Sequence, residues 1–302
     1  MIHRKTATDY IIDIIIYAIM IAILVVTLYP FLNSLAISFN HADDTTRGGI
    51  YLWPRVFTIR NYQRIVENPL LYNAYFITVA RTLVGTITGL FFTSILAFGL
   101  AHSDLIGLRF YVMICIISIY FSGGLIPYYF LIRNLGLTNT FWVYVIPNLV
   151  TVWNMIIMRS HFRSIPAALE ESARIDGARY WTVFWRIVFP ISTPTVAAIS
   201  LFIGVSQWNA WFDAAMFVSD QTLKPMQSIL ISIVSQARFA EQLASLGTGA
   251  SMDMGNIARG REVNVRSLTM ATMIVTIVPI VMVYPFLQKY FIKGIMVGSL
   301  KG

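Results

Sequence analysis

The sequence predicts an all-α membrane protein, and three observations carry that prediction. Only 12% of the 302 residues are charged, about half the share that is usual in a soluble domain, and the mean hydropathy is +0.69. Six runs of at least 22 residues contain no Asp, Glu, Lys or Arg. Because a helix needs roughly 20 apolar residues to cross a bilayer core about 30 Å thick, each run is long enough to span.

The six runs predict six transmembrane helices in a single domain that covers residues 1–302. The runs are Ile14–Ala42, Thr82–Ser103, Phe110–Ile132, Asn134–Met158, Ile187–Phe212 and Ser267–Gln288. We expect the helices at about 11–38, 73–102, 109–132, 138–159, 187–212 and 267–291. A seventh run, Pro225–Ala237, has 13 residues and is too short to span as a helix, which favours a place outside the membrane or at its interface.

The first run could instead belong to a cleaved signal peptide. It is too long for one, and its end, Tyr29–Asn33, lacks a small-residue cleavage site. We therefore expect it to remain as the first spanning helix.

Six spans put both termini on the same side of the membrane, and the basic residues should show which side that is. A crude count assigns 11 of the 22 Lys and Arg to each side, so the total does not decide. The positive-inside rule weighs charges close to helix ends, and the 160–186 segment and its edge concentrate arginines there. They are Arg159, Arg163, Arg174, Arg179 and Arg186. We expect this segment and both termini in the cytoplasm of a prokaryote, with a multi-pass protein in the cytoplasmic (inner) membrane.

The longest connection, residues 213–266, should then be extracytoplasmic. It carries a tract rich in glycine, with Gly247, Gly249, Gly255 and Gly260 among Ser, Asn and Thr. A flexible connector is one interpretation, and a loop that contacts a partner is the other, since long loops in compact proteins are often functional.

The segment between the fourth and fifth predicted helices has the signals of a separate short helix. Ser164 can cap a helix, and Pro166 fits a first turn. Gly177 suits the position after a helix, where a left-handed backbone is needed. We therefore expect a helix of about three turns, then a bend, then a second helix that enters the membrane.

One face of this short helix is small and mildly apolar. It is formed at positions i, i+3, i+4 and i+7 by Leu169, Ser172, Ala173 and Asp176. Such a face could lie in a groove of another protein, and an ordinary surface helix would show the same pattern.

The same segment resembles the EAA signature of ABC importer permeases, which is Glu-Ala-Ala, three residues, Gly, nine residues, Ile, two residues and Pro. The sequence has Glu171-Ser172-Ala173, Gly177, Ile187 and Pro190 at those spacings, with Ser172 in place of the first Ala. Asp176, Ala178 and Phe184 are similar to the sugar-importer branch. Two further segments also resemble that branch, Gln207–Phe212 and Tyr284–Gly294.

The resemblance, which covers nearly the whole chain, implies one membrane-spanning subunit of a binding-protein-dependent sugar importer of the maltose type, and possibly of its polysaccharide and oligosaccharide branch. It implies a type I permease fold with a cytoplasmic coupling helix that docks on an ATPase. The implied partners are a homologous permease subunit, two ATPase subunits or a dimer of one, an extracytoplasmic solute-binding protein and membrane lipid. The implied coupling residues are Glu171, Ser172, Ala173, Asp176, Gly177, Ala178, Phe184, Ile187 and Pro190. ATP-driven closure would switch the membrane helices between two packings.

Several other chemistries are not supported by the sequence. It contains no Gly-x-x-x-x-Gly-Lys-Ser/Thr run, so we expect no cofactor in this chain, with ATP and Mg²⁺ bound by the partner ATPase. The four histidines are far apart in the sequence, which disfavours a metal site. The basic residues are scattered beside the membrane runs, which disfavours nucleic acid as a partner.

The transported sugar should meet amide and aromatic side chains. The candidates for the pathway are Asn154, Gln207, Trp208, Asn209 and Trp211. Interface anchoring is the competing interpretation for the tryptophans, and helix bridging is that for Asn154.

Two other functional classes compete with the importer permease. An ion-coupled secondary transporter commonly carries charged groups inside the membrane, and the uncharged runs count against it. A channel or an assembly factor would have no transport cycle.

Overall fold

The structure is a computed structural model that describes residues 7–245 and 265–299. Within these ranges the regular structure is helical, apart from one isolated antiparallel bridge between Asn40 and Phe57. The glycine-rich tract of the 213–266 connection lies outside the described residues.

The chain divides into two compact units, residues 1–68 with 232–277 and residues 69–231 with 278–302. The first unit contains α1 (Ala7–Ser38), α2 (Ala42–Thr46), α3 (Arg60–Glu67), most of α13 (Met226–Ser245) and the first part of α15 (Val265–Ser299). The prediction of a single permease domain over the whole chain stays a prediction.

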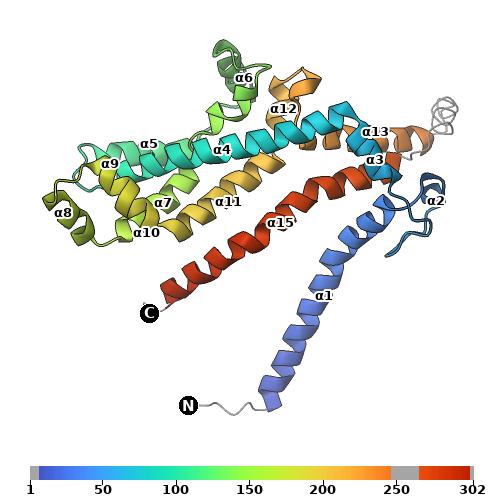
Figure 1. The fold of residues 1–302 in the computed structure, drawn as a ribbon, viewed down its shortest axis with the longest axis horizontal. Helices are drawn as coiled ribbons and strands as arrows, with labels where there is room; N and C mark the ends of the chain where they lie inside the picture. Colours follow the sequence, from blue (N-terminus) through green and yellow to red (C-terminus); the bar gives the residue numbers. More distant parts are fainter. Residues whose placement is uncertain (1–6, 246–264, 300–302) are drawn as a thin grey trace. The chain divides into compact units, whose positions relative to one another are not determined.

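The second unit holds most of the helices (Figure 1). In chain order it contains α4 (Pro69–Ala101), α5 (Leu108–Tyr120), α6 (Leu125–Asn134), the turns η1 (Phe141–Tyr144) and η2 (Ile146–Asn148), α7 (Val152–Ser164), α8 (Ala167–Ile175), α9 (Tyr180–Val183), the π-turn η3 (Phe184–Val188), α10 (Phe189–Ile191), α11 (Thr193–Asn209), α12 (Phe212–Phe217) and the turn η4 (Gln221–Leu223). The last part of α15 also belongs to it.

Helix α1 shows the membrane character of the chain most directly. It is apolar around its whole circumference, and none of its most apolar stretch is buried within the chain. A soluble protein does not leave so large an apolar surface in water, so this surface requires lipid or another subunit.

Three helices in the described residues are long and apolar enough to span a membrane alone. They are Thr8–Ser38, Pro69–Ala101 and Arg266–Val283. Three further apolar helix pairs are bent, by 116° between α5 and α6, by 44° between η1–η2 and α7, and by 85° between α9–α10 and α11. The predicted six spans are recovered when each bent pair is counted as one span.

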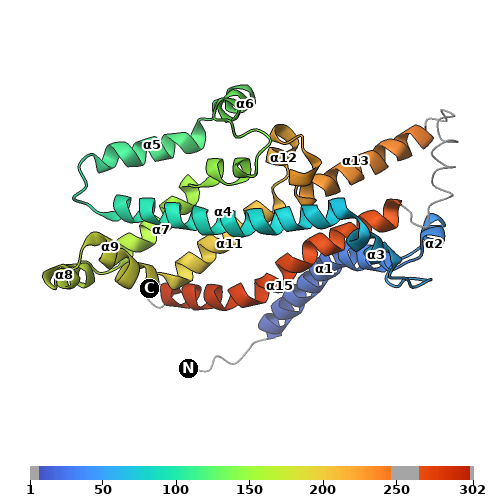
Figure 2. The same ribbon diagram turned by 45° about the horizontal axis from the view of Figure 1, so that its top comes forward.

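The predicted continuous helix 109–132 is therefore wrong in its middle. The sequence there is Phe121-Ser122-Gly123-Gly124, and Gly124 has a φ of +86°. This backbone conformation is open to glycine and strained for other residues, so the chain turns sharply before α6 begins. Figure 2 shows α6 turned away from the end of α5.

Proline explains why the helix predicted at 187–212 is broken. Pro194 has no N–H to donate to the carbonyl of Pro190, and its ring crowds that carbonyl, which favours the break between Ile191 and Thr193. The Thr193 hydroxyl donates to the Pro190 carbonyl oxygen at 2.6 Å, which satisfies the orphaned acceptor. In the helix predicted at 138–159, Pro147 likewise sits in the short 3₁₀ turn η2, and the regular helix α7 begins only at Val152.

Two local predictions also need correction. Ser164 does not cap the coupling-segment helix, because α7 continues through it and Pro166 takes the N-cap position. The Ser164 hydroxyl instead donates to the His161 carbonyl at 2.7 Å. The described part of the 213–266 connection is mainly helical, with α12, η4 and α13, rather than an irregular loop.

A core of the second unit joins α4, α7, α11 and the π-turn. Its buried side chains include Leu100, Met155, Phe162, Phe184 and Ile199. Helices α8 and α9 lie beside one end of α4, and α12 lies toward the other end (Figure 1). The α8 end and the α12 end of this unit are therefore joined by α4, which is unbroken over 33 residues.

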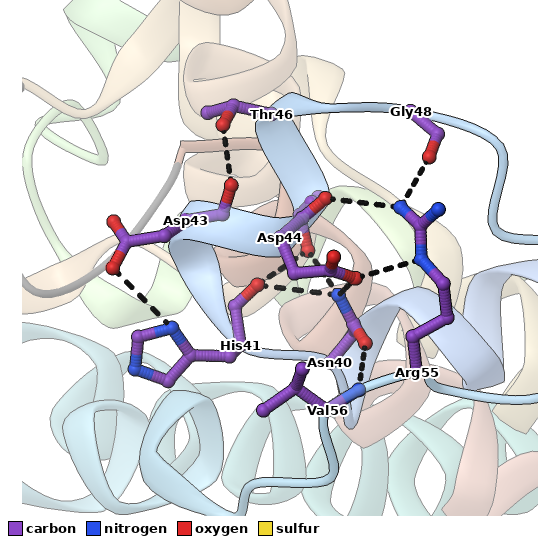
Figure 3. A network of polar contacts seen from close by, with 9 residues as sticks. Asn40, His41, Asp43, Asp44, Thr46, Gly48, Arg55 and Val56 are labelled. Atoms are coloured by element: carbon purple, nitrogen blue, oxygen red, sulfur yellow. Dashed lines mark hydrogen bonds and ion pairs between the residues drawn. The ribbon is translucent and has the colours of Figure 1, made fainter.

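A polar network holds the segment between α1 and α3 in the first unit (Figure 3). Fully buried Asn40 donates to the Asp44 carboxylate at 3.0 Å and accepts from the Val56 N–H at 2.9 Å. Arg55 donates from Nε to the same carboxylate at 3.0 Å and from Nη2 to the Gly48 carbonyl oxygen. The Asp44 carboxylate therefore links two separate stretches of this segment.

The network predicts that this segment loosens in acid. The Asn40 amide is the largest cause that lowers the pKa of Asp44 below its ordinary value of 3.8; Arg55 adds to it, and desolvation opposes it. Because the folded pKa lies below the unfolded pKa, the stabilisation is present above the unfolded value and is lost as pH falls through the folded value. Hydrogen exchange at the Val56 amide should accelerate, relative to unstructured amides, from about pH 6 to about pH 3.

Asp44→Asn supplies the control for this experiment. It keeps the shape and removes the ionisation, so the relative exchange at Val56 should then be nearly independent of pH. Equal pH dependence in the variant would show that another group is responsible.

Candidate functional site

The EAA-like segment forms a short helix, α8, that ends in a glycine turn. Gly177 has a φ of +83° and donates from its N–H to the Arg174 carbonyl at 3.0 Å. The next N–H, of Ala178, donates to the Ala173 carbonyl at 2.9 Å. This pair of bonds is a Schellman end, which satisfies the last carbonyls of a helix. The predicted position of Gly177 directly after the helix is confirmed.

The signature residues divide into two groups by burial. Those turned toward the chain's own core are Ala173, Ala178 and Phe184, and Phe184 is only 1% exposed. Ile187 is half-buried and lines a hollow beside α8. Those on the surface are Glu171, Ser172, Asp176, Gly177 and Pro190. One half of the signature thus shapes the bend between α8 and the π-turn, and the other half is available to a partner.

The face predicted for docking is divided in the same way. Ala173 packs against the core, whereas Leu169, Ser172 and Asp176 remain exposed. Helix α8 buries none of its residues fully, and Ile175 on it is 87% exposed. The surface that α8 presents therefore includes Ile175 together with three of the four predicted positions.

A polar cavity of about 660 Å³ lies among α4, α7, α11 and α12. Four of the five candidate pathway residues line it, which are Asn154, Gln207, Asn209 and Trp211. Asn148, Thr151 and Ser206 add further hydrogen-bonding groups to the same wall. Amide, hydroxyl and aromatic groups around one cavity can bind the hydroxyls and apolar faces of a neutral polar ligand.

The fifth candidate, Trp208, does not belong to this cavity. It is 7% exposed, packs edge-to-face against Tyr75, and contributes to a separate apolar cavity of about 390 Å³. Successive residues on α11 point in different directions, so Gln207 and Asn209 reach the polar cavity while Trp208 does not.

A buried arginine forms one wall of the polar cavity. Arg81 on α4 has no exposed surface, and its Nη2 and Nη1 donate to the two carboxylate oxygens of Asp213 at 2.6 and 3.2 Å. Its Nε and Nη2 donate to Gln207 Oε1 at 3.3 and 3.1 Å, and its Nη1 also donates to the Ala210 carbonyl at 3.1 Å. The guanidinium lies 4.3 Å from the centre of the Tyr144 ring.

This arrangement uses all five N–H donors of the guanidinium. The bidentate bond to Asp213 neutralises the charge, which is the condition for keeping a cation away from water. Arg81 therefore holds α4, the end of α11 and α12 together and has no donor left for a ligand in the cavity.

The sequence prediction missed this pair. Arg81 comes directly before the run Thr82–Ser103, and Asp213 directly follows Ile187–Phe212, so a definition of spans by absence of charge excluded both. One signal was available in the sequence. Arg81 is the one charged residue of α4, and a charged side chain in an apolar helix needs a partner of opposite charge. The argument from uncharged runs against an ion-coupled carrier concerned the runs alone, and the Arg81–Asp213 pair lies just outside two of them.

Comparison with known proteins gives relatives that match over nearly the whole chain. The polygalacturonan/rhamnogalacturonan transport system permease protein YtcP of Bacillus subtilis is 32% identical over 290 residues, covering 96% of this chain and 98% of that protein. No family model matches the sequence.

Solved structures show the same similarity. A chain of a bacterial ABC transporter involved in the import of the acidic polysaccharide alginate superposes with a TM-score of 0.84 at 26% identity, covering 96% of this chain and 99% of that one. A chain of the bacterial alginate ABC transporter in complex with an alginate pentasaccharide-bound periplasmic protein superposes with a TM-score of 0.58 at 13% identity, which shows a shared fold. It covers 94% of this chain and 96% of that one.

The contact between α4 and α11 predicts that Gly85→Ala destabilises the protein. A Cβ at Gly85 would lie 2.8 Å from Cδ and Nε2 of Gln207, so Gln207 must move and its bonds to Arg81 must weaken. We expect a loss of about 1–3 kcal/mol, measured by thermal unfolding of the purified complex in detergent.

Gly99→Ala is the matched control on the same helix, because a Cβ there would meet nothing within 4 Å. It should leave stability unchanged or raise it by about 0.5–1 kcal/mol, the usual advantage of alanine in a helix. Equal melting temperatures for the two variants would contradict the role given to the Gly85 contact.

Proposed function

Because the chain belongs to the family of membrane-spanning permease subunits of binding-protein-dependent ABC sugar importers, we propose that it forms half of the pathway of an ATP-driven importer. The predicted fold is confirmed, since the chain superposes over 96% of its length on an importer permease. The imported molecule is proposed to be a sugar or an oligosaccharide delivered by an extracytoplasmic solute-binding protein.

The observation that carries the proposal is the form of α8. The signature segment is a separate exposed helix with a glycine-ended turn, and its inner residues pack on the core that includes α4, α7 and α11. A helix held by its own subunit on one side and open on the other is suited to dock on a moving partner. We assign the docking surface to Glu171, Ser172, Asp176 and Ile175.

The polar cavity supports the proposed substrate class. Its amides and hydroxyls suit neutral sugar hydroxyls, and Trp211 offers an aromatic face. The names of the relatives point to polygalacturonan and rhamnogalacturonan for one and to alginate for another. We propose that Asn154, Gln207, Asn209 and Trp211 contribute to the pathway, with Trp208 in a packing role.

The proposed partners follow from the family. A homologous permease would supply the other half of the pathway, and the exposed surface of α1 would lie against it or against lipid. ATP and Mg²⁺ would be bound by two ATPase subunits, so this chain is a transporter subunit rather than an enzyme. The 213–266 connection would meet the binding protein, although its glycine-rich tract lies outside the described residues.

The docking surface predicts that Ile175→Glu uncouples the importer. Ile175 is 87% exposed, so the change leaves the subunit's own packing intact while it places an unpaired charge in the proposed interface. Burying such a charge costs about 2–5 kcal/mol of affinity. The substrate-stimulated ATPase activity of the reconstituted complex should therefore be largely lost.

Val66→Glu is the control, because Val66 on α3 is also a strongly exposed apolar residue, at 73%. This variant should keep its stimulated ATPase activity. Full stimulated activity in the Ile175 variant would argue against α8 as the docking helix.

The proposed orientation makes a prediction about labelling. With the single native cysteine Cys115 replaced by Ser, we expect a cysteine at Glu171 to react with a membrane-impermeant maleimide only in opened cells. A cysteine at exposed Asp220 should react in intact cells. The reverse pattern would place α8 outside and overturn the topology.

A further inference from the structure

A histidine at the end of α4 is bonded to α8. The Nε2 atom of His102 lies 2.8 Å from Oε1 of Glu170, and its Nδ1 atom lies 2.8 Å from the carbonyl oxygen of Phe98. The two residues of the ion pair are 68 positions apart in the sequence. This bond therefore joins two helices that meet only through the tertiary fold.

The His102 ring makes two hydrogen bonds. A carbonyl oxygen has no hydrogen to give, so Nδ1 donates to Phe98, and Nε2 shares a proton with the Glu170 carboxyl group. When that proton stays on the imidazole, the bond joins two opposite charges. Such a charge-assisted bond is stronger than a neutral one.

The helix ends favour these charges. His102 follows the last turn of α4, where the partial charge of the helix is negative, and Glu170 lies in the first turn of α8, where it is positive. The side chains of His102 and Glu170 are only 17% and 25% exposed, so water screens them less than it would a surface pair.

Aromatic rings enclose the pair. The rings of Phe98 and Tyr180 lie edge-on to the His102 ring, with centres 4.6 and 5.3 Å away. The guanidinium of Arg174 on α8 lies over the Tyr180 ring, 4.8 Å from its centre. The His102 ring is thus fixed in position by α4 and α9 and reaches α8 through a single carboxylate.

Helix α4 connects this point to the polar cavity. His102 follows Arg81 by 21 residues in a helix without a break, so the two sites are roughly 30 Å apart along it. The spans that contain α7 and α11 are bent by 44° and 85°, so neither provides an unbroken helix of this length. A displacement of α4 at His102 is therefore carried as a rigid movement to Arg81 at the cavity wall.

We propose that His102 is a positioning residue that transmits the movement of α8 to α4 through Glu170. The proposal rests on the proposed function, in which α8 docks on the ATPase. In this role the pair does not bind ATP or sugar. The pair keeps α4 attached to α8 while α8 is displaced. When the bond is removed, ATP hydrolysis continues but no longer moves the cavity wall.

The test uses the whole importer with its partner subunits in proteoliposomes, and it measures sugar uptake and ATP hydrolysis together. His102→Ala and Glu170→Ala should each retain ATP hydrolysis within about twofold, while uptake per ATP falls about tenfold, the size expected for one lost charge-assisted bond. The double variant should fall no further, because both changes remove the same interaction. His102→Gln, whose amide can still donate to Glu170, should recover part of the ratio.

Asp104→Asn is the matched control, since Asp104 lines the same hollow as His102 and Glu170. It should leave uptake per ATP unchanged. A purely structural pair would lower uptake and hydrolysis in parallel, and that result overturns the proposal, as would additive losses in the double variant. If the unmodified complex shows no sugar-stimulated hydrolysis, the proposed function fails instead, which is a separate outcome.

Discussion

The need to neutralise one buried guanidinium organises the α12 end of the second unit. Arg81 has no exposed surface, so every N–H must find an acceptor and its charge must find a carboxylate. Gln207, Ala210 and Asp213 meet this need from the end of α11 and the start of α12. Because these residues must reach Arg81, they also define a wall of the polar cavity. The position of α12 relative to α4 thus follows from an electrostatic requirement.

The broken helices depend on a related constraint on backbone groups. In a bilayer an unsatisfied carbonyl costs several kcal/mol, so a break is tolerated only where another group replaces the lost bond. Thr193 does this for Pro190 at the start of α11. Outside the apolar runs, the Schellman bonds at Gly177 satisfy the last carbonyls of α8. The breaks place a cavity and an exposed helix at opposite ends of α4, which remains straight enough to connect them.

Parts of the fold and site could be predicted from residue patterns, and parts could not. The glycine at 177 predicted a helix that ends just before it, because the left-handed backbone after a helix favours glycine. The amides Asn154, Gln207 and Asn209 were chosen as polar residues in apolar runs, and they line one cavity. Trp208 lines a separate apolar cavity, which the sequence could not show, because the direction of a side chain on α11 depends on where its neighbours pack.

The sequence by itself determined that the chain crosses a membrane, where its apolar segments lie and that a short helix separates two of them, because these depend on hydrophobicity and on local turn chemistry. Only the tertiary structure decided the partnership of Arg81 with Asp213 and that of His102 with Glu170. Both pairs join residues far apart in the chain; Arg81, Asp213 and His102 lie at the edges of uncharged runs, whereas Glu170 lies in the segment between two of them. Charge complementarity between distant residues leaves no periodic pattern in a single sequence, so it appears only when packing brings them together.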